Sequence, residues 1–116
     1  EMVTCWAALD DATIDNGCLW MLPGTHRFGH IDREEWWGYE EQALAGGLPA
    51  ERPIEFKAGD CSFHHGLILH SSRANKTAKR RRGYATHYVN ARCRYTGAPE
   101  KSDALPVRGR SFAGCV

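Results

Sequence analysis

The sequence predicts a mainly β domain that contains one short helix. Short runs of apolar, β-branched and aromatic residues alternate with glycine, proline, asparagine and aspartate, a pattern typical of strands joined by turns. One segment differs, because Glu34 to Leu44 begins in a capping box at Asp32 and ends before a glycine pair, which predicts a helix. With 116 residues, the chain is long enough for a single domain.

The first part of the chain predicts two strands. Met2 to Leu9 is an apolar and aromatic run, which favours a strand. Asp10 to Gly17 is predicted to turn, because Asn16-Gly17 can adopt positive φ without strain. Cys18 to Leu22 is then expected to run antiparallel to the first strand, and Pro23-Gly24 ends it.

The second part predicts three more strands. Pro53 to Lys57 is expected to be short, and Cys61 to Leu69 is expected to be a longer strand that ends on His70. A polar loop from Ser71 to Lys79 follows, and the next strand is predicted to open with three arginines and continue to about Val89. On such a strand Arg81 would point to one side, and its two arginine neighbours to the other.

Composition and charge exclude several classes of function. A formal charge of +1 predicts no general attraction to nucleic acid or membrane, and no apolar run approaches the roughly 20 residues of a membrane span. Six basic residues lie between Arg73 and Arg82, but no aromatic residue lies among them to stack on bases. Five cysteines without a C-x-x-C pair predict buried free thiols and a reducing, cytoplasmic compartment.

Two residue types between Gly59 and Tyr88 suggest a metal site and a carboxylate-binding site. A histidine at a strand end, such as His70, can hold a metal. An arginine one strand away, such as Arg81, can hold a carboxylate through a two-pronged ion pair. A non-haem iron enzyme with an oxo-acid cosubstrate requires such a pairing.

Several motifs occur in the order found in one known family. His70, Ser72, Asn75 and Arg81 precede G-Y-A-T-H-Y, and further matches are V-T-C-W-A-A-L-D-D, N-G-C-L-W-M-L-P-G-T-H and V-R-G-R-S-F-A-G-C-V. In these motifs the chain resembles the distal half of the phytanoyl-CoA dioxygenase family. The segment from Asp32 to Arg52 has no recognisable counterpart.

The resemblance implies a fold and an activity. The family folds as a double-stranded β-helix, a cupin-like jelly roll, and its members are Fe(II)- and 2-oxoglutarate-dependent dioxygenases that hydroxylate small organic substrates. It implies that His70 is a metal ligand, that Arg81 and Ser72 bind the cosubstrate, and that Trp6 lines the cosubstrate site. Read without the resemblance, Trp6 is a core residue, as a strand tryptophan often is.

The chain departs from the family in one respect. The other two iron ligands of the family form a His-x-Asp pair that precedes the strand matching Cys5 to Leu9. We therefore expect residues 1–116 to be the C-terminal part of one jelly-roll domain, whose incomplete edges a homo-oligomer or strand-swapped dimer would cover. His30-Ile31-Asp32 has the same spelling, but its capping box and its place after P-G-T-H favour a helix start over a metal site.

A second hypothesis belongs to another class. The chain could instead be a non-catalytic, cupin-like β-domain that binds an anion, or an inactive truncated remnant, since one histidine alone does not hold iron well.

Overall fold

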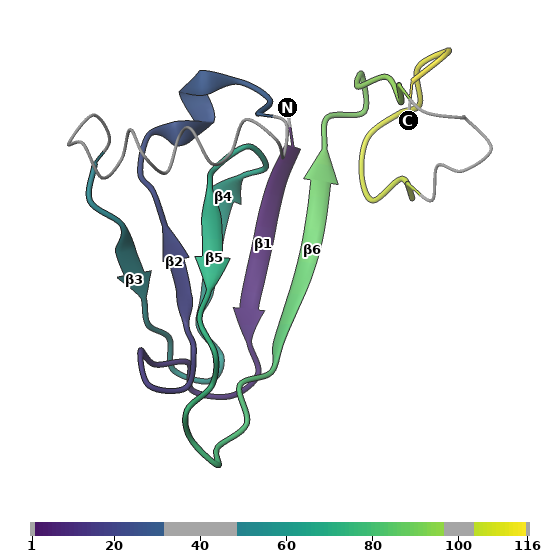
Figure 1. The fold of residues 1–116 in the computed structure, drawn as a ribbon. Coiled ribbons are helices and arrows are strands. Elements are labelled where there is room, and N and C mark those ends of the chain that lie inside the picture. The colour runs from purple at the N-terminus through teal and green to yellow at the C-terminus, as the bar shows by residue number, and fades with distance from the viewer. Residues whose placement is uncertain (1, 32–48, 97–103, 116) are drawn as a thin grey trace.

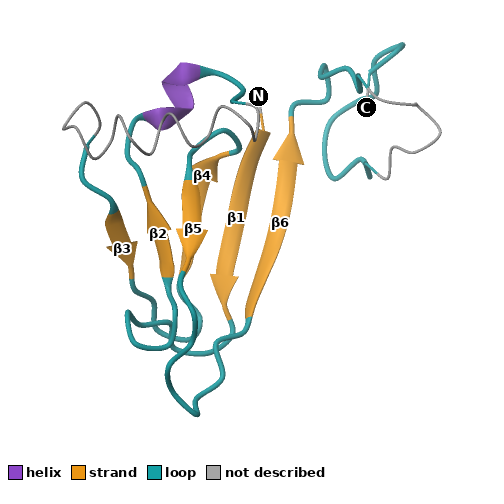
Figure 2. Ribbon diagram, in the orientation of Figure 1, coloured by secondary structure: helices purple, strands orange, loops and turns teal. Residues whose placement is uncertain are grey.

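The computed structural model describes residues 2–31, 49–96 and 104–115, which form two antiparallel sheets of three strands each (Figure 1). The first sheet has the order β4-β1-β6 and contains β1 (Met2–Ala8), β4 (Cys61–His65) and β6 (Gly83–Val89). The second has the order β3-β2-β5 and contains β2 (Leu19–Met21), β3 (Arg52–Ile54) and β5 (His70–Ser72). A 3₁₀ helix, η1 (Thr25–Phe28), follows β2 (Figure 2). The prediction of a mainly β fold is confirmed.

Strand β1 is the centre of the first sheet. Thr4 lies opposite His64 of β4 on one side and opposite His87 of β6 on the other. Because directly opposite residues share a face, these three side chains belong to one side of the sheet. Thr4 and Ala8 are buried, so this side is the inner face, which packs towards the second sheet.

The second strand was expected to run antiparallel to the first, but the two strands do not pair. Strand β2 pairs with β3 and β5 in the second sheet, because the connection from Leu9 to Cys18 carries the chain from one sheet to the other. Within it Ala12 forms a bridge to Phe56, which ties this connection to the one between β3 and β4.

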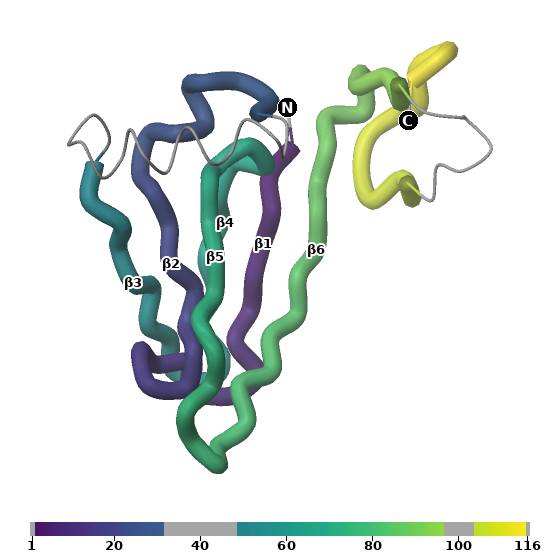
Figure 3. The backbone as a smooth tube through the Cα atoms, in the orientation of Figure 1, coloured from purple at the N-terminus to yellow at the C-terminus, as the bar shows by residue number. Residues whose placement is uncertain are grey.

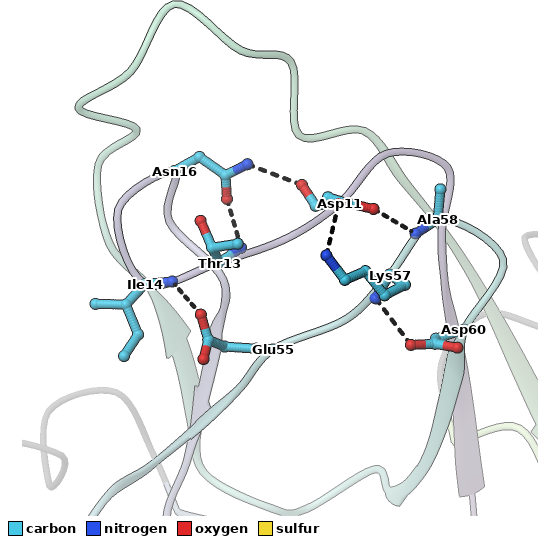
Figure 4. A network of polar contacts seen from close by, with 8 residues as sticks. All are labelled: Asp11, Thr13, Ile14, Asn16, Glu55, Lys57, Ala58 and Asp60. Carbon is cyan, nitrogen blue, oxygen red and sulfur yellow. Dashed lines mark hydrogen bonds and ion pairs between the residues drawn. The ribbon is translucent and has the colours of Figure 1, made fainter.

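A network of polar contacts fixes this connection (Figure 4). The Asn16 side chain accepts a bond from the Thr13 amide (2.7 Å) and donates one to the Asp11 carbonyl (2.8 Å). The Asp11 carboxylate in turn accepts bonds from the Ala58 amide (2.9 Å) and the Lys57 ammonium (3.1 Å). The predicted Asn-Gly turn is present, since Gly17 has φ of 87°, a conformation that favours glycine.

The single strand predicted from Cys61 to Leu69 is also wrong, because it is divided between the two sheets. Strand β4 ends at His65, the chain turns at Gly66 and Leu67, and β5 begins at His70 in the other sheet. The Gly66 amide donates to the Met2 carbonyl (2.8 Å). An added Cβ at position 66 would lie close to the Met2 side chain and backbone, so the turn packs tightly against the start of β1.

The arginines do not open the last strand, in contrast to the prediction. Strand β6 begins at Gly83, so Arg80, Arg81 and Arg82 lie in the connection before it, and the alternation of a strand does not decide where they point. The predicted helix at Glu34–Leu44 lies outside the described residues.

The hydrophobic core lies at one end of the space between the sheets. Ala8, Ala12, Cys18 and Phe56 are buried there, and Trp6, Trp20 and Ile54 pack against them. The β1–β2, β3–β4 and β5–β6 connections gather at this end, whereas η1 and the β4–β5 turn lie at the opposite end (Figure 3).

Two further predictions concerned the burial of the cysteines and the absence of a membrane span. The cysteines were expected to be buried, but only Cys18 is buried, Cys61 is exposed, and the other three are partly exposed. In the described residues there is no helix long and apolar enough to cross a membrane.

Candidate active site

The four predicted site residues come from both sheets and from one connection. His70 and Ser72 lie on β5, opposite the buried residues Met21 and Leu19 of β2, and so belong to the inner face of the second sheet. Trp6 lies on β1, and Arg81 lies two residues before β6. Across the described parts of the chain, no hydrogen bond or ring contact joins these four residues directly.

The ring of His70 is oriented by the backbone. Its Nδ1 lies 2.9 Å from the carbonyl oxygen of Ile68. A carbonyl only accepts, so Nδ1 carries the proton and donates, which leaves Nε2 with a free lone pair. Metal-binding histidines commonly have this arrangement, in which one ring nitrogen is held by an acceptor and the other binds the ion.

A buried threonine supports the residue before His70. Thr25 is fully buried, and its hydroxyl donates to the Leu22 carbonyl (2.8 Å) and accepts from the Leu69 amide (3.0 Å). The Leu22 amide donates to the Leu69 carbonyl (3.0 Å). The P-G-T-H turn therefore fixes the backbone at the start of β5.

His64 is a residue of this region that the sequence did not assign to the site. Its ring lies 5.5 Å from that of His70 between centroids, and its Nδ1 is buried without a hydrogen-bond partner. Burial, with the charges of His70 and His87, lowers the pKa of His64 below its ordinary value. The imidazole is therefore neutral at neutral pH.

Ser62 shares this inner face of β4. Its Oγ is also buried without a partner, and it lies opposite Trp6. Period-two alternation could have placed Ser62 and His64 on one face. It could not have brought Ser62 to Trp6, because that pairing joins distant parts of the chain. Nor could it have shown that the turn after His65 places His70 in the other sheet.

The described residues match only part of the iron site that the family resemblance implies. His70 offers a correctly oriented nitrogen, but the described residues contain no group of three or more histidine, cysteine, aspartate and glutamate side chains that could hold a metal ion. His30 is exposed, and Asp32 lies outside the described residues. The facial set of two histidines and a carboxylate that Fe(II) prefers is therefore not completed in the part of the chain that is described.

Trp6 packs in the core beside the segment that carries Arg81. Its ring centroid is 5.1 Å from that of Phe56, which agrees with the core reading of this tryptophan. Its indole also lies against Gly83, where an added Cβ would overlap the ring. Trp6 therefore contacts the chain two residues after Arg81.

The three consecutive arginines have different environments. The guanidinium of Arg82 bonds both oxygens of Asp10, through Nε to Oδ2 (2.8 Å) and Nη2 to Oδ1 (2.8 Å). Arg80 is exposed, whereas Arg81 is half-buried. Burial and the charge of Glu55 raise the pKa of the Cys18 thiol, and the charges of Arg81 and Arg73 act in the opposite direction.

The comparisons with known proteins agree on one family. The model of the family described as phytanoyl-CoA dioxygenase (PhyH) matches residues 1–83. The human peroxisomal phytanoyl-CoA dioxygenase is 33% identical over 110 residues, which cover 82% of this chain and 30% of that protein. The chain spans 30 to 33% of the length of the curated relatives that it matches first.

Solved structures of similar fold include a non-haem monooxygenase and an alpha ketoglutarate-dependent epimerase. The non-haem monooxygenase ThoJ in a nickel complex has a TM-score of 0.74 and 28% identity, over 99% of this chain and 40% of that one. The epimerase SnoN in complex with Fe³⁺, alpha ketoglutarate and nogalamycin RO has a TM-score of 0.65 and 26% identity, over 98% of this chain and 46% of that one. These neighbours confirm the cupin-like double-stranded β-helix.

Proposed function

Because the chain belongs to the phytanoyl-CoA dioxygenase family, we propose that it forms part of an Fe(II)- and 2-oxoglutarate-dependent dioxygenase that hydroxylates a small organic substrate. The chain then represents the C-terminal part of one jelly-roll domain, residues 1–116. When bound, the iron and its cosubstrate activate dioxygen for attack on a C–H bond. The residues of this chain hold the metal and the cosubstrate in position.

The orientation of His70 carries the proposal. Its Nδ1 is held by the Ile68 carbonyl (2.9 Å), so Nε2 is the nitrogen that would bind Fe(II). Ser72 is two residues further on the same inner face, where its hydroxyl can donate to a carboxylate. Trp6 provides an apolar wall across from them on β1, beside Gly83.

Arg81 is the arginine best suited to the far carboxylate of 2-oxoglutarate. Asp10 already engages the guanidinium of Arg82, and Arg80 is exposed. Arg81 is half-buried, and its planar fork matches a carboxylate in a way that a lysine cannot. These environments, rather than strand alternation, support the assignment.

One observation favours the alternative of a non-catalytic anion-binding β-domain. The described residues supply one oriented histidine and no group of three metal-binding side chains. On this reading Arg81 would bind a carboxylate without iron chemistry. The two functions differ in whether 2-oxoglutarate contacts a metal, which an absorbance measurement can detect.

The arrangement of exposed residues supports a proposal about association. The outer face of the first sheet carries exposed apolar and aromatic side chains, namely Val3, Phe63, Tyr84 and Tyr88. A homo-oligomer or strand-swapped dimer would cover such a face and its edges. A cytoplasmic location, inferred from unpaired cysteines, stays a prediction.

The test is a titration of 2-oxoglutarate into anaerobic, Fe(II)-loaded protein of full natural sequence, followed by metal-to-ligand charge-transfer absorbance. Arg81→Lys should raise the dissociation constant about ten- to a hundredfold, because lysine keeps the charge but loses the bidentate fork. Arg80→Lys is the matched control and should change it little. Equal effects of both changes would indicate a diffuse basic surface. Absence of the charge-transfer band in the wild type would overturn the oxygenase proposal.

A further inference from the structure

Asp10 binds the residue next to Arg81 in three ways. Its Oδ2 accepts bonds from the Arg82 backbone amide (2.9 Å) and from Nε of the Arg82 side chain (2.8 Å). Its Oδ1 accepts a further bond from Nη2 (2.8 Å). One carboxylate thus holds both the backbone and the side chain of Arg82.

The backbone bond acts directly on Arg81. The amide nitrogen of Arg82 belongs to the peptide group whose carbonyl is that of Arg81, and a peptide group is planar. Fixing the amide therefore also fixes the orientation of the Arg81 carbonyl. On the other side of Arg82, its carbonyl accepts a bond from the Leu9 amide (3.0 Å), so both peptide groups of Arg82 are held.

Residues of β1 and its extension also hold the next position. Trp6 packs on Gly83 so closely that a side chain there would overlap the indole. By contrast, every residue from Ser71 to Arg80 is exposed. Arg81 thus sits at the boundary between an exposed connection and a segment that β1 and Asp10 fix in place.

We propose that Asp10 is a positioning residue for Arg81: by clamping Arg82, it holds the backbone from which the Arg81 side chain reaches the cosubstrate carboxylate. This inference rests on the proposed function. An arginine on an unanchored loop must lose backbone and side-chain freedom when it binds its partner, and prior anchoring removes part of that cost. Asp10 also occupies the guanidinium of Arg82, so this neighbour does not offer a competing fork.

The chain supplies a matched control for Asp10. The adjacent residue Asp11 makes the same kind of clamp, because its carboxylate accepts bonds from a backbone amide (Ala58) and a cation (Lys57). These two partners lie on the β3–β4 connection, which carries no proposed site residue. Asp10→Ala and Asp11→Ala remove comparable sets of bonds. A merely structural effect should appear in both variants.

The experiment measures 2-oxoglutarate and Fe(II) dissociation constants of the full natural sequence, with thermal unfolding in parallel. Asp10→Ala should raise the 2-oxoglutarate dissociation constant about three- to tenfold, because the released backbone around Arg81 must then be ordered when the ligand binds. Its Fe(II) dissociation constant should stay that of the wild type. Asp11→Ala should leave both constants unchanged.

A double variant shows whether Asp10 acts through Arg81. If it does, Asp10→Ala should have a smaller effect in an Arg81→Lys background than in the wild type, because coupled residues are not additive. Full additivity, or an equal effect of Asp11→Ala, would overturn the inference while Arg81→Lys still weakened binding. If the wild type bound no 2-oxoglutarate, the proposed function itself would fail, and the two failures are therefore distinguishable.

Discussion

The rings of His64 and His70 lie 5.5 Å apart between centroids although the two residues belong to different sheets. Only a short turn separates β4 from β5 in the sequence, but that turn crosses from one sheet to the other. The contact therefore marks the place where the inner faces of both sheets meet beside the proposed metal ligand.

Replacement of His70 should remove the Fe(II) binding of the chain. His70→Ala removes the imidazole whose Nδ1 is held by the Ile68 carbonyl and whose Nε2 is the proposed ligand. Anaerobic equilibrium dialysis against Fe(II) would measure the loss. His65→Ala is the control, since His65 instead packs near His26, with 5.3 Å between centroids. Loss of binding in His30→Ala or Asp32→Ala, with binding retained in His70→Ala, would show that the H-I-D triplet is the metal site.

Removal of the Thr25 hydroxyl should destabilise the fold. Thr25→Val keeps the shape but removes the hydroxyl that accepts from the Leu69 amide and donates to the Leu22 carbonyl. The Leu22 carbonyl keeps the Thr25 amide (3.4 Å), whereas the Leu69 amide loses its buried partner, which should cost about 1 to 3 kcal/mol. Urea unfolding measures the change in the free energy of unfolding. Thr77→Val is the control, because that hydroxyl bonds Asn75 and Lys79 on an exposed loop, and an equal loss there would contradict the role of burial.

The bonds between Asp10 and Arg82 should make the free energy of unfolding depend on pH in the acidic range. Hydrogen bonds from the Arg82 side chain and amide hold the pKa of Asp10 well below its ordinary value of 3.8. A carboxyl whose pKa is lowered on folding adds stability above the pKa of the unfolded state, and this stability is lost as pH falls through the folded-state pKa. Below about pH 4, the free energy of unfolding in urea should therefore fall more steeply with pH for the wild type than for Asp10→Asn. Parallel curves would show that the carboxylate adds nothing.

The exposed outer face of the first sheet should cause self-association. Phe63 is 69% exposed and Tyr84 is 62% exposed, and large aromatic surfaces in water favour contact with another surface. Light scattering of the wild type should show a dimer or larger species, and a Phe63→Ser, Tyr84→Ser variant should shift it towards the monomer. A wild type that stays monomeric at high concentration would contradict this expectation.

The sequence predicted the element types better than their pairing. Alternation, a local signal, predicts Met2–Ala8 nearly at its bounds and the end of β6 at Val89, but it places the start of β6 at the arginines rather than at Gly83. Pairing is not local: nothing near Cys18 reveals that β2 joins β3 and β5, and nothing near Cys61 reveals that a turn at Gly66 sends the chain to the other sheet. The same limit concealed His64 and Asp10, whose partners His70 and Arg82 are set by the tertiary fold.

The central position of β1 has a consequence for how the molecule forms. Its two neighbours, β4 and β6, begin at Cys61 and Gly83, so β1 can pair only with strands that follow β2 and β3 in the sequence. Such long loop closures are slow, because the entropy is lost before any contact is gained. Trp6 and Asp10 can meet Gly83 and Arg82 only at that late stage. Arg81, the proposed cosubstrate residue, therefore reaches its place only after these long-range pairings have formed.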